Sequence, residues 1–294
     1  MDYFKQKYAQ PPFKRGLVLG CGNGWVERSL IDRGVAEHFD AFDADDHYLQ
    51  GAEAEKGDRP IRYFKDSFAT FKADGQYDLI VNVAALHHAK RLYVHLARLV
   101  DALRPEGIFV NWEYVGPSRN QYGLDHVERM SAINAALPPR FRSPHPLRPS
   151  LLGAVRGDPT EAVHSAEIVS AVAAHFDFVE FKQLGGGIAY QILWNNIAEF
   201  DKDDAEAAST LGELISADEE ATRSRAVPNL FAFFVCKHRA SSDAATTLRR
   251  FIWRDLVEPS RELFARAAFN LYPSEMLLLA GRAFREGKRR IGVS

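Results

Sequence analysis

The first 115 residues alternate between short apolar runs and longer stretches with apolar side chains at helical spacing. The short runs predict buried strands over 15–19, 38–42, 61–64, 77–83 and 108–112. The longer stretches predict helices over 25–33, 45–55 and 92–103. Strands separated by single helices form right-handed βαβ units, so this half of the chain predicts a parallel sheet.

The pattern becomes less regular in the second half of the chain. Seven prolines between 116 and 160 indicate a long irregular excursion, interrupted by one helix over 124–136. Ser165 lies where it could cap a helix that runs to His175, because a serine oxygen accepts hydrogen bonds from the free amide groups at a helix start.

Two more strands are expected over 178–184 and 230–237, with a glycine break at 185–187 and two helices between them. The fold class is therefore α/β: a doubly wound, mostly parallel seven-stranded sheet with helical insertions after the fifth and sixth strands. A helical C-terminal extension is expected as well, since apolar side chains share one helix face from Leu248 to Leu256.

The chain shows no internal repeat and no low-complexity tract, so one elaborated domain accounts for most of its 294 residues. We assign residues 1–239 to this domain and residues 240–294 to the extension. The insertions over 116–175 and 185–227 are expected to form a lid over the sheet.

Composition indicates an ordinary globular protein, with 46% hydrophobic and 26% charged residues. No apolar stretch approaches the roughly 20 residues that span a bilayer, and the N-terminal segment lacks the apolar core of a secretory signal. The two cysteines, Cys21 and Cys236, exclude a disulfide framework and a cysteine-rich zinc site, and are expected to be small packing residues. We therefore expect a cytoplasmic protein.

The net charge of −2 gives no general attraction to nucleic acid, so no nucleic-acid partner is expected. The charge is unevenly placed, because residues 237–294 hold twelve Lys or Arg and six Asp or Glu. This basic end could dock weakly on a membrane surface or a partner protein. The acidic clusters over 37–58 and 199–220 are expected to be solvated faces.

The most informative segment is the glycine-rich turn after the first strand, Leu-Val-Leu-Gly-Cys-Gly-Asn-Gly over 17–24. Glycines at Gly20, Gly22 and Gly24 let the backbone pass close to a ligand, and the following helix start offers free amide groups. Asp43 ends the next strand, where a carboxylate can accept hydrogen bonds from both ribose hydroxyls. The turn therefore predicts a site for a nucleoside cofactor.

The spacing of these glycines separates two cofactor classes. The dinucleotide fingerprint G-x-G-x-x-G would need a glycine where this chain has Trp25. The pattern found here resembles that of the class I S-adenosylmethionine-dependent methyltransferases, in particular a bacterial group of type 11/12. The resemblance covers about residues 14–115 and two later strands, through Asp43, Asp66-Ser67-Phe68, Tyr77-Asp78-Leu79-Ile80, Leu86-His87-His88, residues 103–110 and residues 229–235.

The resemblance implies S-adenosylmethionine as cofactor. The residues that it assigns to cofactor binding are Gly20, Cys21, Gly22, Asn23, Gly24, Asp43, Ala44, Asp66, Ser67, Phe68 and Asn82. One position departs from the family, which usually has an acid two residues before the first loop glycine, where this chain has Val18. The ammonium group of the cofactor would then be held by other groups, such as the Gly20 carbonyl and a residue of the N-terminal segment.

Candidate catalytic residues follow the fourth and fifth strands. His87 and His88 are candidate bases, with His88 slightly favoured, because histidine titrates near neutral pH and can accept a hydroxyl proton. Glu113 ends the fifth strand on the ligand side of the sheet. A purely structural role, such as binding loop backbone, remains open for all three residues.

A polar and aromatic group lies just beyond this strand, and it suits a hydroxyl-rich acceptor. Its members are Tyr114, Arg119, Asn120, Gln121 and Tyr122. A solvated loop is the competing interpretation, and Arg119 could instead bind a phosphate or a carboxylate.

Four further residues, Asp158, Glu161, His164 and Glu167, could be taken for metal ligands. Their context, with a Pro-Thr-Glu sequence ahead of Ser165, favours a helix entrance instead. We therefore expect no metal site.

These observations favour a methyltransferase that moves a methyl group to a small-molecule or glycan-linked acceptor, at a hydroxyl oxygen. A cytosine C5 acceptor is excluded, because that chemistry needs a cysteine nucleophile after the fourth strand and residues 82–87 contain none. Two alternatives remain open: a non-catalytic interaction module on the same scaffold, which Val18 slightly supports, and an NAD-dependent oxidoreductase, which the missing glycine at Trp25 disfavours.

Overall fold

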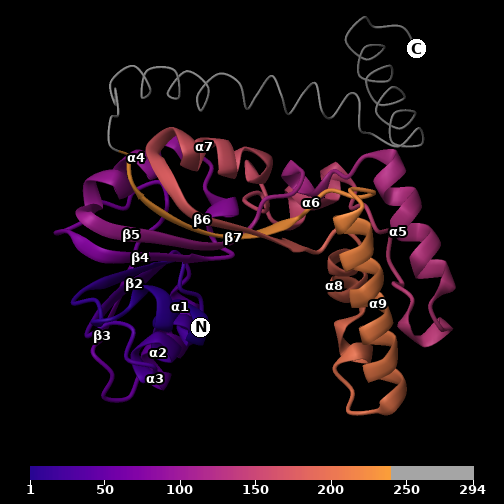
Figure 1. The fold of residues 1–294 in the computed structure, drawn as a ribbon, viewed down its shortest axis with the longest axis horizontal. Coiled ribbons are helices and arrows are strands. Elements are labelled where there is room, and N and C mark those ends of the chain that lie inside the picture. Colours follow the sequence, from indigo (N-terminus) through magenta and orange to yellow (C-terminus); the bar gives the residue numbers. More distant parts are fainter. Residues whose placement is uncertain (240–294) are drawn as a thin grey trace, which may run out of the picture.

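The computed structural model describes residues 1–239, and the strands of this part form one sheet in the order β3-β2-β1-β4-β5-β7-β6 (Figure 1). Five strands run parallel to one another: β1 (Gly16–Leu19), β2 (Phe39–Asp43), β3 (Ile61–Lys65), β4 (Tyr77–Val83) and β5 (Leu103–Tyr114). β7 (Phe231–His238) is antiparallel to both β5 and β6 (Phe176–Gly185). The predicted doubly wound, mostly parallel sheet is confirmed.

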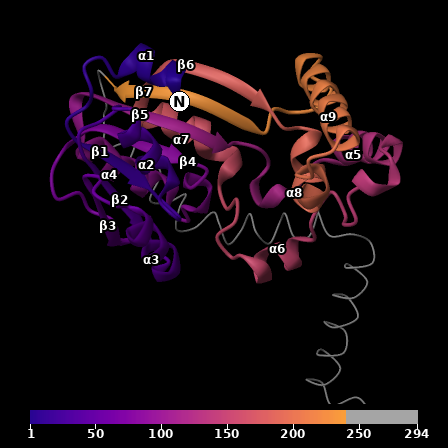
Figure 2. The ribbon, with the colours of Figure 1, turned by 90° about the horizontal axis from the view of Figure 1, so that it is seen from below.

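Helices cover both faces of this sheet, as Figures 1 and 2 show. One face carries α4 (Leu92–Ala102) and α7 (Ile168–His175), and the other carries α1 (Asp2–Tyr8), α2 (Trp25–Asp32) and α3 (Asp46–Glu55). Successive side chains of β1 point to opposite faces of the sheet. Leu17 and Leu19 pack with α4 and α7 on one face, whereas Val18 packs with α2 on the other.

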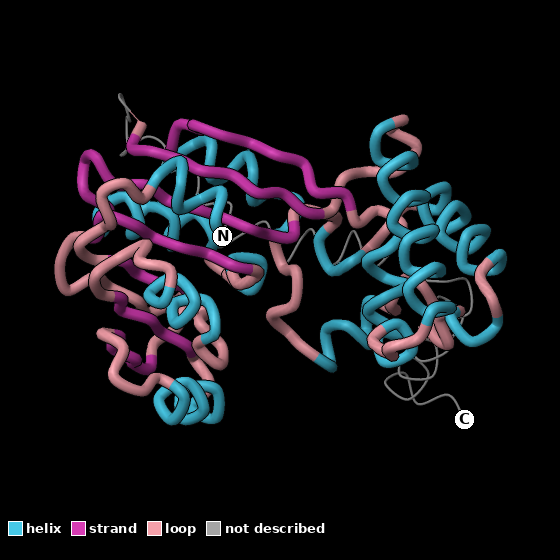
Figure 3. Tube along the Cα trace, turned by 60° about the horizontal axis from the view of Figure 1, so that its bottom comes forward, coloured by secondary structure: helices cyan, strands magenta, loops and turns pink. Residues whose placement is uncertain are grey.

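The insertions build a separate helical body beyond one end of the sheet (Figures 1 and 3). Its helices are α5 (Leu124–Ala136), α6 (Leu151–Gly157), α8 (Ala189–Phe200) and α9 (Ala205–Arg223). A third apolar core, which includes Tyr122, Met130, Ile192 and Leu214, joins α5, α8 and α9. Short 3₁₀ turns complete the fold: η1 (Leu86–His88), η2 (Ser118–Asn120), η3 (Pro139–Phe141) and η4 (Ser165–Glu167).

Three features differ from the sequence-based expectation. The helix α1 was not predicted, and it docks through Tyr3, Lys7 and Tyr8 on the Glu180 carboxylate of β6. Ser165 does not cap the helix, because its hydroxyl donates to the Ala162 carbonyl and α7 begins after the η4 turn. β5 begins at Leu103 rather than at 108.

No helix within residues 1–239 is long and apolar enough to cross a membrane. The extension over 240–294, with its expected helix and docking role, lies outside the described residues.

Candidate active site

The glycine loop forms a hollow at the carboxyl end of β1. Gly20, Gly22 and Gly24 all have positive φ angles, of +54°, +53° and +78°, which an L-residue rarely adopts. The hollow has a volume of about 310 Å³, and its lining includes Val18, Gly20, Cys21, Gly22, Asn23, Tyr48 and Val83.

Asp43 ties this loop to the end of the neighbouring strand. Its Oδ2 atom accepts a hydrogen bond from the Gly22 amide at 2.9 Å, and its Oδ1 atom accepts from the Asp45 amide at 2.9 Å. The Asp66 amide donates to the Asp43 carbonyl oxygen at 3.1 Å, so the ends of β2 and β3 lie side by side. The structure therefore brings together the glycine loop and both predicted acids.

The other residues assigned to the cofactor lie in different surroundings. The Asp66 carboxylate accepts hydrogen bonds from the Ser67 amide and the Thr70 hydroxyl, and the Phe68 ring packs edge-on against His95. Ala44 follows β2 directly, and Gly24 faces Ala52 and Tyr63 rather than the hollow. Asn82 is fully buried and bonds Glu113 and the Leu86 amide.

Glu113 is the centre of a buried hydrogen-bond network at the ends of β4 and β5. Its Oε2 atom accepts from Asn82 Nδ2 at 2.9 Å and from the Leu86 amide at 2.8 Å. Its Oε1 atom lies 2.7 Å from His87 Nδ1 and accepts from the Tyr114 amide at 2.6 Å. Because Glu113 is fully buried, this carboxylate can position His87 but cannot reach an acceptor itself.

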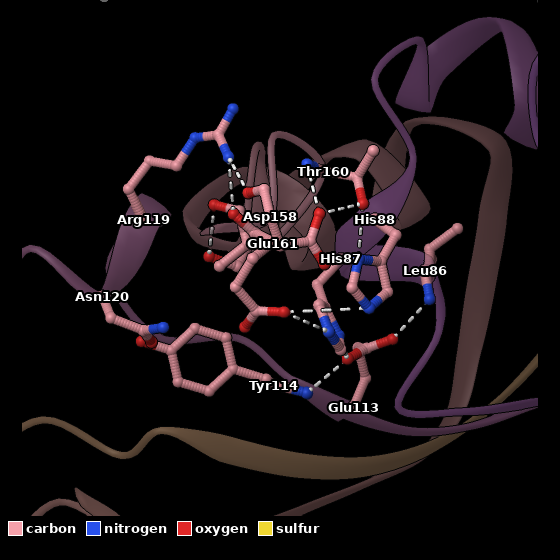
Figure 4. Close-up of polar contacts among 12 residues, drawn as sticks. Leu86, His87, His88, Glu113, Tyr114, Arg119, Asn120, Asp158, Thr160 and Glu161 are labelled. Atoms are coloured by element: carbon pink, nitrogen blue, oxygen red, sulfur yellow. Dashed lines mark hydrogen bonds and ion pairs between the residues drawn. The ribbon is translucent and has the colours of Figure 1, made fainter. Parts of the chain in front are cut away.

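The two histidines of η1 meet Glu161, which lies in the segment between α6 and η4 (Figure 4). Glu161 Oε2 lies 3.6 Å from His87 Nε2 and 3.7 Å from His88 Nε2. His88 Nδ1 lies 3.0 Å from the Thr160 hydroxyl. Asp158 Oδ2 lies 3.7 Å from His88 Nδ1.

The pKa values of His87, His88 and Glu161 are shifted in different directions. Burial opposes a charge on His87, but the hydrogen bond with Glu113 and the nearby Glu161 carboxylate outweigh it and raise the pKa of His87 to about 10. Burial, together with the charge on His87, lowers the pKa of His88. Burial acts to raise the pKa of Glu161, yet contact with His87 brings it below the ordinary value.

These side chains lie at one wall of a cavity of about 1020 Å³ between the sheet and the helical body. Its aromatic lining consists of Tyr48, Trp112, Tyr114, Tyr190, Trp194 and Phe231, and its polar lining includes Asn120, Gln191, Asn195, Asp158 and Glu161. Residues of both insertions contribute to this lining.

The five predicted acceptor residues divide into two groups. Tyr114 and Asn120 line the cavity. Arg119 lies behind it, donating to the carbonyl groups of the 158–161 segment, while Gln121 bonds the Pro149 carbonyl and Tyr122 is fully buried in the third core. Arg119 therefore fixes a loop of the site rather than facing the cavity.

Several residues that the structure places in the site have only weak signals in the sequence. The local sequence around Glu161 predicts a helix entrance, and no spacing relates this residue to His87. Tyr48, Trp112 and Tyr190 line the cavity although nothing in their local pattern distinguishes them from packing residues.

Comparison with known proteins adds a family match to this geometry. Residues 17–111 match the family described as a methyltransferase domain. An uncharacterized methyltransferase of Mycobacterium tuberculosis is 30% identical over 121 residues, which cover 41% of this chain and 60% of that protein. The human mitochondrial arginine-hydroxylase NDUFAF5 is 26% identical over 203 residues, covering 68% of this chain and 57% of that protein.

The chain thus spans about 60% of the length of these curated relatives. Among solved structures, an S-adenosylmethionine-dependent methyltransferase from Mesorhizobium loti aligns with a TM-score of 0.48 at 14% identity, covering 77% of this chain and 91% of that one.

Proposed function

We propose that this chain, whose residues 17–111 match a methyltransferase domain, is a class I S-adenosylmethionine-dependent methyltransferase that moves a methyl group to a hydroxyl oxygen of a small or glycan-linked acceptor. The observation that carries this proposal is the meeting of two hollows at the end of β4. Val83 lines the glycine-loop hollow, the next residue Ala84 lines the large cavity, and Tyr48 lines both. A donor in the first and an acceptor in the second would meet at this point.

Methyl transfer depends mainly on the alignment of the reacting atoms. The sulfonium of the donor is already activated, so holding the oxygen, the methyl carbon and the sulfur in line supplies much of the rate. A hydroxyl acceptor must also lose a proton, and the wall formed by His87, His88 and Glu161 presents the His88 imidazole and the Glu161 carboxylate, both of which can accept a hydrogen bond from it.

The cavity lining supports an acceptor with ring faces and several hydroxyl groups. Trp112, Tyr114 and Tyr190 offer flat apolar surfaces, and Asn120 and Gln191 offer amide groups that both donate and accept. This combination suits a sugar or a hydroxylated ring, which is why a glycan-linked acceptor is retained.

Calorimetry with S-adenosylmethionine and with its demethylated product tests the donor site. We expect both to bind, and Asp43→Ala to weaken binding about tenfold or more, because the ribose hydroxyls lose an acceptor worth roughly 1–3 kcal/mol. Asp46→Asn is the matched control, since Asp46 is an exposed first-turn residue of α3 that pairs with Lys65. Absence of binding to the wild-type chain would overturn the proposal.

Methyl transfer itself is tested with isotope-labelled donor and a panel of hydroxylated small molecules and glycans, followed by mass spectrometry of the products. A methyl ether as product supports the proposal. Donor binding without transfer to any hydroxyl would favour the non-catalytic module, and transfer to nitrogen would overturn the choice of acceptor atom.

A further inference from the structure

The cluster of His87, His88 and Glu161 has the composition of a metal site. Each of the three residues offers one ligand atom, and these atoms all lie within 4.8 Å of one another. Two imidazole nitrogens and one carboxylate oxygen form a ligand set that first-row transition metals favour, whereas Mg²⁺ and Ca²⁺ favour oxygen alone.

The distances within the cluster fit a bridging ion better than direct contact. Glu161 Oε2 lies 3.6 Å from His87 Nε2 and 3.7 Å from His88 Nε2, which is too long for hydrogen bonds. Ligands about 2.1 Å from a tetrahedral ion lie roughly 3.4 Å apart, so a small inward movement of the side chains would enclose one ion.

The second nitrogen of each ring is already engaged. His87 Nδ1 lies 2.7 Å from Glu113 Oε1, and His88 Nδ1 lies 3.0 Å from the Thr160 hydroxyl. Histidine ligands in metal sites typically use their other ring nitrogen in this way, which fixes the ring and directs the free nitrogen toward the ion. Here both Nε2 atoms face the same carboxylate (Figure 4).

We propose that His87, His88 and Glu161 bind one divalent first-row transition-metal ion, leaving coordination positions open toward the acceptor cavity. All three residues line that cavity. The segment that carries Glu161 is held in place independently of any ion, because the Arg119 guanidinium donates to the Glu161 and Pro159 carbonyl groups at 3.0 Å each.

The role of the ion rests on the proposed function, although the site does not. An acceptor hydroxyl bound to the ion would have a lowered pKa and release its proton to water. The resulting oxygen attacks the methyl carbon, so that an O–C bond forms, the C–S bond breaks, and the sulfur leaves as a neutral thioether. The ion thereby takes the place of a histidine base.

The test uses the full chain, stripped of metal with a chelator and titrated with Zn²⁺ by calorimetry and with Co²⁺ by visible absorption. We expect one equivalent to bind, with a Co²⁺ spectrum of nitrogen and oxygen ligation. Glu161→Gln and His88→Gln should each weaken binding at least tenfold. His164→Gln is the matched control, because His164 lies in the same segment but bonds the Lys90 carbonyl.

Absence of stoichiometric binding to the wild-type chain, or binding that survives in the Glu161→Gln/His88→Gln double variant, would overturn the metal site. Circular dichroism checks that each variant is folded. The Co²⁺ spectrum of the wild-type chain tests the ligand set even if a variant fails to fold. Titration of the same samples with S-adenosylmethionine separates the two proposals: donor binding without metal refutes this inference alone, and metal binding without donor refutes the proposed function alone.

Discussion

His87 Nδ1 lies 2.7 Å from Glu113 Oε1, joining a side chain of the cavity wall to a fully buried carboxylate on β5. The same carboxylate accepts hydrogen bonds from Asn82 and from two backbone amides, those of Leu86 and Tyr114. Every partner of Glu113 therefore acts as a donor toward it. The Glu113 carboxylate thus binds the end of β4, the end of β5 and the η1 turn.

Glu113→Gln should destabilise the fold and disturb His87 together. The new amide group would face a donor at one of the two oxygen positions, and an unsatisfied buried donor costs roughly 1–3 kcal/mol. Urea denaturation measures the free energy of unfolding, and histidine NMR resonances report the His87 ring. Glu161→Gln is the comparison, since its carboxylate is partly exposed and it should change stability much less. Equal stability of wild type and Glu113→Gln would contradict the network.

Arg119 should act on the reaction through the loop that it holds. Its guanidinium donates to the carbonyl groups of Asp158, Pro159 and Glu161, and it does not line the large cavity. Arg119→Met should lower kcat/KM for methyl transfer about tenfold, because Glu161 loses its support, and Arg119→Lys should restore part of the loss. Donor affinity is the internal control, and it should stay unchanged in both variants.

A drop in donor affinity as large as the drop in kcat/KM would show that Arg119→Met perturbs the whole domain. Full activity of Arg119→Met would show instead that the 158–161 segment needs no such support.

The sheet and the glycine loop could be predicted because their signals are local. The apolar runs and the glycines at 20, 22 and 24 lie within a few residues of the structure they form. The start of β5 could not be predicted from local signals. Arg104-Pro105-Glu106-Gly107 is typical of a turn, yet Leu103 already pairs with Tyr77 of β4. The register then shifts, and the next pair is Leu79 with Ile108. Pairing with a neighbouring strand outweighs the local preference there.

Long-range contacts account for the features that the sequence did not reveal. The helix α1 packs on Glu180 of β6, more than 170 residues away along the chain. Glu161 meets His87 because long-range contacts hold that segment at the end of β4, among them Arg119 to the Glu161 carbonyl and the Val163 amide to the His87 carbonyl. Neither contact has a periodicity or spacing that a single sequence displays.

Substitution of two loop glycines should separate donor binding from stability. Gly22 lines the glycine-loop hollow, and a Cβ atom there would meet no atom of the described residues within 4 Å. A Cβ atom at Gly24 would lie 2.4 Å from the Tyr63 hydroxyl and 2.9 Å from the Ala52 Cβ. Gly22→Ala should weaken donor binding at least tenfold and lower stability by only about 1–2 kcal/mol through its positive φ.

Gly24→Ala should lower stability further, because the Tyr63 and Ala52 side chains must move as well. Calorimetry measures donor binding and thermal melting measures stability for both variants. Gly22→Ala with normal donor affinity would remove this loop from the cofactor site.

Glu27 should make the stability of the domain depend on pH. It is fully buried on α2, and burial raises its pKa from 4.5 to about 7, although Tyr63 and Arg28 act in the opposite direction. The folded state therefore binds more protons than the unfolded state between about pH 4.5 and pH 7, so the free energy of unfolding contributed by Glu27 falls as pH rises through this window.

Glu27→Gln removes this titration while keeping the size of the side chain. We expect the variant to be more stable than wild type above pH 7, by on the order of 3 kcal/mol, and to lose the advantage below pH 4.5, where Glu27 is protonated in both states. Urea denaturation across this range measures the difference. Glu55→Gln, at an exposed carboxylate on α3 that pairs with Arg28, should leave the slope unchanged. Parallel pH profiles of wild type and Glu27→Gln would show that Glu27 is ionised in the folded protein throughout.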